Sequence, residues 1–169
     1  IDPQGHLWAA IYQTNSQNIV HEYDWNTWKS HNTEIFPLAG NYGSDVAFDN
    51  QQNIWFAGHQ LLTRFDGVSW HSYTQQDFGV NASYFDIWSL AVEETTGNLW
   101  MAFYENNDDP VGFAKFDGTH FTTFQTPEES DVFEILPRPN GNVWVASAGD
   151  GLGYFNGSAW TWYNENNSP

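Results

Sequence analysis

The chain has 169 residues, of which 18% are aromatic, and its 4 basic and 21 acidic side chains give a net charge of −17. That charge repels phosphate backbones and anionic lipid, so we do not expect nucleic-acid binding. No stretch approaches the roughly 20 apolar residues that a membrane-spanning helix needs, so we expect no membrane insertion, and the lack of cysteine excludes disulfides and thiolate metal sites.

One short phrase recurs four times along the chain. It reads Gly-His-Leu-Trp, Gln-Asn-Ile-Trp, Gly-Asn-Leu-Trp and Gly-Asn-Val-Trp, and it ends at Trp8, Trp55, Trp100 and Trp144. These tryptophans are 47, 45 and 44 residues apart. Polar turn residues lead into each phrase, which therefore predicts a turn followed by a strand.

A second phrase follows each of the first ones. It places two aromatic residues around a turn, and the pairs are Tyr23 and Trp28, Phe65 and Trp70, Phe116 and Phe121, and Phe155 and Trp160. The turn contains Asp-Gly or Asn-Gly in the last three repeats, which predicts a hairpin with a type I′ turn because both central residues of that turn need positive φ. In the first repeat, Trp25-Asn26 replaces the glycine turn.

Two further strands complete each unit. An inner strand before the Trp phrase is expected at residues 46–48, 87–92 and 132–136, and an edge strand after the turn at residues 70–73, 121–124 and 160–163. No such inner strand precedes Ile1, and residues 164–169 lack the apolar pattern to supply one. No segment shows sustained helical periodicity.

Four short strands in about 45 residues, repeated, are typical of a propeller. We therefore predict an all-β chain, a single array of four consecutive four-stranded antiparallel blades at residues 1–40, 41–80, 81–127 and 128–169, with the first blade lacking its inner strand. A β-solenoid is the competing architecture, but its repeats are usually shorter. The repeated aromatic residues are expected to anchor neighbouring sheets, and the four tryptophans that end the first phrase should be mostly buried. The anchors are Trp8, Trp28, Trp55, Trp70, Trp100, Phe121, Trp144 and Trp160.

Four blades leave several assemblies open. They are a compact small ring, half of an eight-bladed ring made by two chains, and an arc of a longer propeller. The missing inner strand argues against closure between the two termini, so we favour the arc, with self-association through exposed blade faces second.

The unit resembles the repeat of the two-component regulator propellers, which occur in extracytoplasmic sensor regions and related secreted bacterial proteins. The matching motifs are the Gly-Asn-Leu-Trp turn and strand and the Phe-Asp-Gly-x-x-Trp-x-x-Tyr hairpin, best kept at residues 65–73 and 155–163. The resemblance covers essentially the whole chain and implies an extracellular or periplasmic location. No charged-then-apolar leader precedes Ile1, so we expect a processed product or an excised piece.

Ligand-binding candidates come from the loops that enter the inner strands or join the second strand of a blade to the third. These loops lie at residues 41–45, 77–86, 104–110 and 148–151. Tyr84, Phe85 and Tyr104 are candidate aromatic platforms for a sugar or a peptide, so the expected partner is a protein or a small-molecule or glycan ligand. The alternative is that these rings cap the sheet ends and pack on neighbouring blades.

The densest oxygen-ligand cluster is at residues 105–110, where Glu105, Asp108 and Asp109 are candidate Ca²⁺ ligands. The cluster lacks the EF-hand order, and a solvated loop is the alternative. No other cofactor is expected. We predict a non-catalytic binding module rather than an enzyme. The alternative is a propeller lyase resembling the streptogramin lyases, which would need a general base and usually a divalent ion at the channel mouth. A His and a Glu at corresponding loop positions of adjacent blades would favour it. The sequence alone picks out no such pair.

Overall fold

The computed structural model describes residues 1–11, 19–32, 43–80, 84–105, 112–127, 131–147, 149 and 151–167. These residues form four antiparallel sheets that follow one another along the chain, here called blades 1 to 4. Blade 1 has three strands and the other blades have four, each hydrogen-bonded to the next in chain order. Blade 1 comprises β1 (Leu7–Ile11), β2 (Ile19–Tyr23) and β3 (Trp28–Asn32), and blade 2 comprises β4 (Gly43–Phe48), β5 (Ile54–Gly58), β6 (Leu61–Phe65) and β7 (Trp70–Thr74). Blade 3 comprises β8 (Phe85–Val92), β9 (Leu99–Glu105), β10 (Phe113–Phe116) and β11 (Phe121–Phe124), and blade 4 comprises β12 (Val132–Arg138), β13 (Asn142–Ser147), β14 (Gly151–Phe155) and β15 (Trp160–Tyr163).

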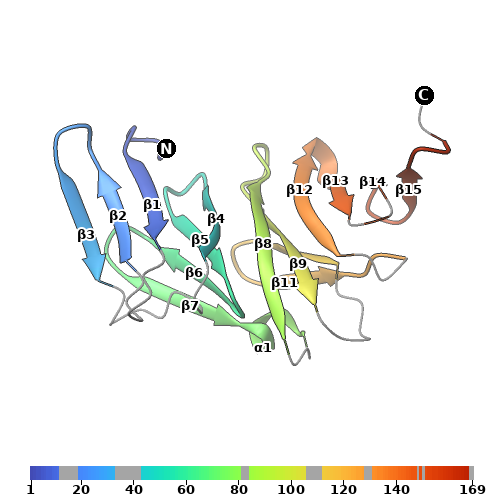
Figure 1. Ribbon diagram of the computed structural model, residues 1–169, viewed down its shortest axis with the longest axis horizontal. Coiled ribbons are helices and arrows are strands. Elements are labelled where there is room, and N and C mark those ends of the chain that lie inside the picture. Colours follow the sequence, from blue (N-terminus) through green and yellow to red (C-terminus); the bar gives the residue numbers. More distant parts are fainter. Residues whose placement is uncertain are drawn as a thin grey trace.

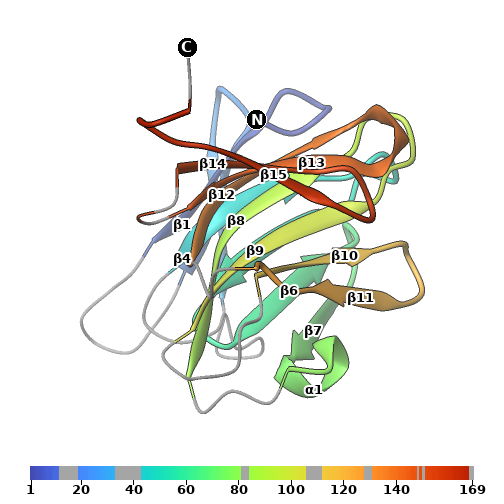
Figure 2. The same cartoon turned by 90° about the vertical axis from the view of Figure 1, so that its right-hand side faces the viewer.

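The blades fan out into an open arc. Blade 1 and blade 4 lie at opposite ends of the molecule in Figure 1, and in Figure 2 blade 4 is nearest to the viewer while blade 1 is behind. The inner strands β4, β8 and β12 contact one another in sequence, and β1 lies beside β4. This confirms the all-β propeller arc and the first blade without its inner strand.

Helix is limited, within the described residues, to α1 (Gln75–Phe78) and a 3-10 turn at Pro139–Gly141. Neither is long enough to cross a membrane. The short α1 is built by local capping, because Thr74 and Asp77 form a capping box and Gly79 ends the helix at φ 71°. It buries Phe78 against Phe103 and Phe121 of blade 3. The helix therefore closes the seam between blades 2 and 3 at one end.

The predicted type I′ turn is wrong. Phe65 pairs with Trp70, so four residues form the loop, and only Gly67 among them has positive φ. The Asp66 carboxylate accepts hydrogen bonds from the backbone N–H groups of Val68 and Ser69, at 2.9 and 2.7 Å. These two hydrogen bonds hold the turn, so a second left-handed residue is not needed.

The same turn is kept in blade 1 without glycine. Trp25 takes the left-handed conformation at φ 70°, and Asp24 accepts the N–H groups of Asn26 and Thr27. The indole of Trp25 also donates to the carbonyl of Gly5, which connects the turn to the one that precedes β1 at the same end of the blade. The first repeat thus departs from the motif in sequence but not in structure.

An aspartate orients the anchor tryptophan in the first two blades. Asp49 accepts hydrogen bonds from the backbone N–H of Asn53 at 2.9 Å and from the indole N–H of Trp55 at 2.8 Å. Asp2 accepts the equivalent two bonds from the backbone N–H of His6 and the indole N–H of Trp8. The aspartate of each turn therefore fixes the orientation of the tryptophan ring at the start of the following strand.

In blade 3 the corresponding turn is one residue longer, and Glu93 replaces the aspartate. Its carboxylate accepts hydrogen bonds from Thr95 and Thr96 instead. The buried Nε1 of Trp100 consequently has no hydrogen-bond partner in the described part of the chain.

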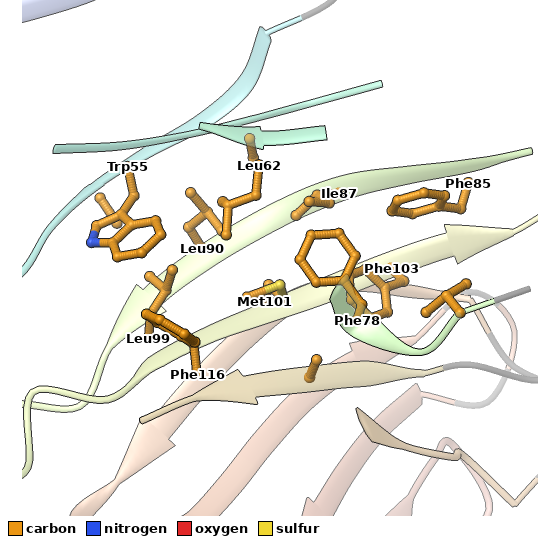
Figure 3. Close-up of a cluster of buried hydrophobic side chains, with 14 residues drawn as sticks. Trp55, Leu62, Phe78, Phe85, Ile87, Leu90, Leu99, Met101, Phe103 and Phe116 are labelled. Atoms are coloured by element: carbon orange, nitrogen blue, oxygen red, sulfur yellow. The ribbon is translucent and has the colours of Figure 1, made fainter. Parts of the chain in front are cut away.

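The core lies between the blades rather than within one sheet. Figure 3 shows the largest cluster, in which Trp55 and Leu62 of blade 2 pack against Leu99, Met101 and Phe116 of blade 3. Two smaller clusters fill the seams between blades 1 and 2 and between blades 3 and 4. A strand presents alternate side chains to its two faces, so each inner blade contributes to two seams.

The four anchor tryptophans occupy equivalent positions, each as the second or third residue of its strand. Trp8, Trp55 and Trp100 are buried, as predicted. Trp144 is less buried than these three, because the described residues place no further blade against its face. Among the second-phrase anchors, Trp70, Phe121 and Trp160 are half-buried and Trp28 is exposed, since it lies on the outer face of blade 1.

Candidate functional site

The inner strands share a β-bulge near their first residues. The pairing register shifts between Gly43 and Asp45 in β4, between Ile87 and Ser89 in β8, and between Val132 and Glu134 in β12. A bulge inserts one residue that does not follow the regular alternation and re-aims its side chain. The inserted residues are Ser44, Trp88 and Phe133.

Two of these inserted residues stack on each other across the seam between blades 3 and 4. The rings of Trp88 and Phe133 are 4.4 Å apart at 27°, and the opposite neighbour of Trp88 is Tyr104, at 4.6 Å and 10°. Tyr104 meets Tyr84 edge to face at 6.4 Å, and Tyr84 lies 4.7 Å from His59 of blade 2. We call these five residues the aromatic row.

The aromatic row crosses three blades and reaches the surface. Tyr84 is 36% exposed and Phe133 is 38% exposed, while the three rings between and beside them are half-buried. Large aromatic side chains at these positions leave part of their apolar area in water, whereas the inter-blade clusters bury theirs almost completely. The row is therefore available for contact with another molecule.

One carboxylate fixes the blade 2 end of the row. Asp86 contacts His59 Nδ1 through Oδ1 at 2.5 Å and accepts the hydroxyl of Tyr84 through Oδ2 at 2.8 Å. The backbones of His59 and Asp86 also form an isolated antiparallel bridge. One side chain of blade 3 thus holds the ring of His59 in blade 2 and the ring of Tyr84, which directly precedes β8.

Side-chain hydrogen bonds also hold the inner strands in register with one another. Asp45 accepts the backbone N–H of Leu90 at 2.7 Å, and Ser89 donates to Glu134 at 3.1 Å. These bonds connect β4 to β8 and β8 to β12 directly after the bulges. The rings that the bulges present are therefore carried on a fixed framework.

The sequence-predicted platform residues divide into two groups. Tyr84 and Tyr104 come together in the aromatic row, although Tyr104 lies in β9 rather than in a loop. Placing Phe85 on a platform is wrong, because it is fully buried against Phe78 and Phe103. Phe85 begins a strand, so its side chain points to the opposite face from those of Tyr84 and Asp86.

The predicted calcium ligands are Glu105, Asp108 and Asp109. Both aspartates and the side chain of Glu105 lie outside the described residues. Within the residues that the structure describes, no group of three or more His, Asp or Glu side chains is arranged to hold a metal ion.

Sequence reasoning missed Trp88, Phe133 and the pairing of His59 with Asp86. A signal for the bulges exists in the spacing of buried residues. Buried positions in a regular strand are two apart, but Val132 and Ile135 are three apart, which places an extra residue between them. The pairing of His59 with Asp86 joins residues of different blades, and no local pattern marks it.

A second histidine–carboxylate network lies in blade 1. Glu22 contacts His6 Nδ1 at 2.8 Å and His31 Nε2 at 3.0 Å. Burial raises the pKa of Glu22, but the hydrogen bonds from His31 and His6 outweigh it, so the pKa lies below its ordinary value. His31 also stacks on Trp8 at 5.0 Å, which makes this network part of the seam between blades 1 and 2.

No family model and no curated protein matches the sequence. Solved structures do match the fold. One is the extracellular domain of BT4673 from B. thetaiotaomicron, a protein described as a one-component system. It is 12% identical to this chain, with a TM-score of 0.72 over 97% of this chain. The extracellular domain of the hybrid two-component system BT3049 from the same organism is 14% identical with a TM-score of 0.64 over 93% of this chain. A further structure of the BT4673 extracellular domain gives 14% identity and a TM-score of 0.52 over 86% of this chain.

This chain spans only about a fifth of the length of those domains, 22% and 21% for the first two. At such identities the likeness shows the fold, which is that of a partial propeller. The propeller fold that the resemblance to the two-component regulator propeller repeat implied is confirmed.

Proposed function

We propose that the chain is a non-catalytic recognition module of an extracellular or periplasmic propeller, and that its ligand contacts the aromatic row. The observation that carries this proposal is the stack of Tyr104, Trp88 and Phe133, in which bulges of the inner strands place Trp88 and Phe133. A bulge that re-aims an aromatic ring out of the buried inter-blade cluster gives up buried area, which favours a role in contact with a partner.

The chemistry of the row favours a ligand with flat apolar faces. Exposed aromatic rings provide stacking area with little loss of conformational entropy, and Asp86 and His59 provide polar contacts at one end. A sugar ring or an extended peptide fits this combination. The net charge of −17 disfavours a phosphorylated or otherwise anionic ligand.

The location rests on the relatives in fold. The matching solved structures are extracellular domains, and a recognition module in a sensor or in a secreted assembly is exposed to ligands outside the cytoplasm. This support comes from the fold alone.

Saturation-transfer NMR with a panel of neutral oligosaccharides and short uncharged peptides tests the proposal. Tyr84→Ala and Phe133→Ala should each weaken binding of a positive probe by about tenfold or more, the usual loss for an aromatic contact at the centre of a binding site. Trp25→Ala removes an exposed indole far from the row and is the matched control. A probe bound equally by all three variants would place the binding site elsewhere and contradict the proposal.

The alternative function, a lyase resembling the streptogramin lyases, is favoured by one observation. His59 and Asp86 come from adjacent blades, and a carboxylate that orients a histidine is an arrangement used for a general base. Incubation with a cyclic depsipeptide lactone, followed by mass spectrometry, separates the two functions. Ring opening that is lost in His59→Ala and Asp86→Asn would establish the lyase, whereas we expect no turnover by the unmodified chain.

A further inference from the structure

The anchor tryptophans of blades 2 and 3 have the same surroundings within their own sheets. Each stacks on an aromatic ring of its edge strand, Trp55 at 5.8 Å and 25° and Trp100 at 5.7 Å and 23°. Arg64 lies over the ring of Trp55 at 5.8 Å from its centroid, and Lys115 lies over the ring of Trp100 at 5.7 Å. The two indoles are therefore oriented alike. Since the N–H of Trp55 faces the turn that precedes its strand and donates to Asp49 there, the N–H of Trp100 faces the corresponding turn of blade 3.

Of these two turns, only that of blade 2 supplies an acceptor. In blade 3 the carboxylate of Glu93 accepts hydrogen bonds from the hydroxyl groups of Thr95 and Thr96, at 3.2 and 2.8 Å. Trp100 is 2% exposed, and its Nε1 has no hydrogen-bond partner among the described residues. A buried donor that is left unpaired is unfavourable. An acceptor from another molecule would remove this penalty.

A cavity lies beside Trp100, where blades 3 and 4 meet, and we call it the blade 3–4 cavity. Its volume is about 320 Å³, whereas the corresponding cavity beside Trp55, where blades 2 and 3 meet, has about 100 Å³. Turn residues of both blades line it, together with Lys115 and the rings of Phe124 and Phe155. One water molecule occupies roughly 10–15 Å³ of such space, and ligand sites begin at about 300 Å³. The blade 3–4 cavity therefore has room for a small organic molecule.

The lining of the blade 3–4 cavity favours an uncharged ligand that carries several oxygen atoms. Lys115 and Glu93 are the charged residues of the lining, and their charges cancel. The other polar side chains of the lining are those of Thr96, Asn98 and Asn140. Hydroxyl and amide groups both donate and accept hydrogen bonds, as the hydroxyl groups of a sugar do. The two phenylalanine rings provide apolar area for the ring face of a sugar.

We infer that the blade 3–4 cavity binds one uncharged sugar unit, and that an oxygen of this sugar accepts the hydrogen bond of Trp100 Nε1. The sugar oxygen has the part that Asp49 Oδ2 has in blade 2. Lys115, which lies over the same ring, is a second donor to the sugar. The ligand thus supplies the acceptor that the longer turn of blade 3 withholds.

The blade 3–4 cavity and the aromatic row are separate sites. Trp88 of the row is near the first residue of β8, whereas Glu93 of the cavity directly follows the last residue of that strand. The two sites therefore lie at opposite ends of β8. The inference is independent of the proposed function, and either can fail without the other.

An NMR titration of the chain with glucose, galactose and N-acetylglucosamine tests the inference. We expect at least one of these sugars to shift the indole N–H signal of Trp100, which is assigned by its loss in Trp100→Phe. That variant keeps an aromatic ring but removes the donor, and it should weaken binding roughly three- to tenfold, the usual effect of one hydrogen bond. Binding to the variant is read from the amide signals of Gly141 and Gly157, which line the cavity. Trp55→Phe removes the equivalent indole N–H of blade 2 and should leave binding unchanged.

Lys115→Gln removes the charge over the same ring and should also weaken binding, so the test does not depend on the folding of one variant. Glucuronic acid should bind more weakly than glucose, because the balanced charges of the lining leave its carboxylate without a counter-charge.

Three results would overturn the inference. The first is an indole signal of Trp100 that none of the neutral sugars shifts, because the cavity then holds water only. The second is a sugar that shifts the indole signal of Trp88 but not that of Trp100, because it binds at the aromatic row. The third is binding that Trp100→Phe and Lys115→Gln both leave unchanged.

Discussion

The contribution of the anchor tryptophan differs between repeats, although the residue and its place in the strand are the same. Trp55 donates its indole N–H to Asp49, whereas Trp100 is equally buried but has an unpartnered Nε1 in the described part of the chain. Trp144 is only half-buried, since the described residues place no further blade against it. The energetic value of a repeated residue therefore depends on its turn and on the next blade.

Comparison of Trp100→Ala with Trp144→Ala measures this difference. Trp100→Ala should lower the free energy of unfolding by about 3–5 kcal/mol, toward the lower end because a buried unpaired donor is removed with the ring. Trp144→Ala should cost about 1–2 kcal/mol, because part of its side chain is already in water. Urea unfolding at a concentration where the chain is monomeric provides both values. Equal losses would mean that the face of blade 4 that carries Trp144 is covered.

At the scale of the element, the hairpin turn is the most regular unit of the chain. In blades 1 to 3 an aspartate accepts two backbone N–H groups, and in blade 4 Asn156 accepts the N–H groups of Ser158 and Ala159 through its amide oxygen. Backbone hydrogen bonds lower the pKa of Asp24, Asp66 and Asp117, with the largest effect from Thr27, Ser69 and His120 respectively. The stabilising contribution of three of the four turns therefore depends on pH, whereas that of the Asn156 turn does not.

The sign of this pH dependence follows from the lowered pKa. A carboxylate with a lower pKa in the folded state stabilises the fold above its ordinary pKa, and the contribution is lost as pH falls through the folded pKa. Replacing Asp24, Asp66 and Asp117 together by Asn should make stability fall less steeply below about pH 4. Asn156→Asp should make it steeper. Urea midpoints measured from pH 6 to pH 2 test both, and parallel curves for all three proteins would contradict the assignment.

At the scale of the whole molecule, stability comes from three inter-blade seams in an open arc. Each seam is filled by aromatic and aliphatic side chains, and each blade depends on its neighbours. No described group is arranged to bind a metal. In the sequence, the acidic cluster at residues 105–110 begins at the last residue of β9 and precedes β10.

We therefore expect the fold to survive removal of metal. Excess EDTA should change the melting temperature by less than about 2 °C, which for a chain of this size corresponds to less than roughly 1 kcal/mol. Differential scanning calorimetry with and without added Ca²⁺ measures this shift. A larger drop that Ca²⁺ restores, and that is absent when Asp108 and Asp109 are replaced by Asn, would make the acidic cluster structural.

The sequence by itself determined the repeat, the number of blades and the three-stranded first blade, because strand alternation and turn chemistry are local and recur at a fixed spacing. It also singled out Tyr84 and Tyr104. Only the tertiary structure separated these from the buried Phe85, since the face that a residue presents depends on where its strand begins. The bulges that expose Trp88 and Phe133, and the contact of His59 with Asp86, depend on how neighbouring blades pack. Whether an anchor is buried likewise depends on the blade beyond it, as the contrast between Trp100 and Trp144 shows.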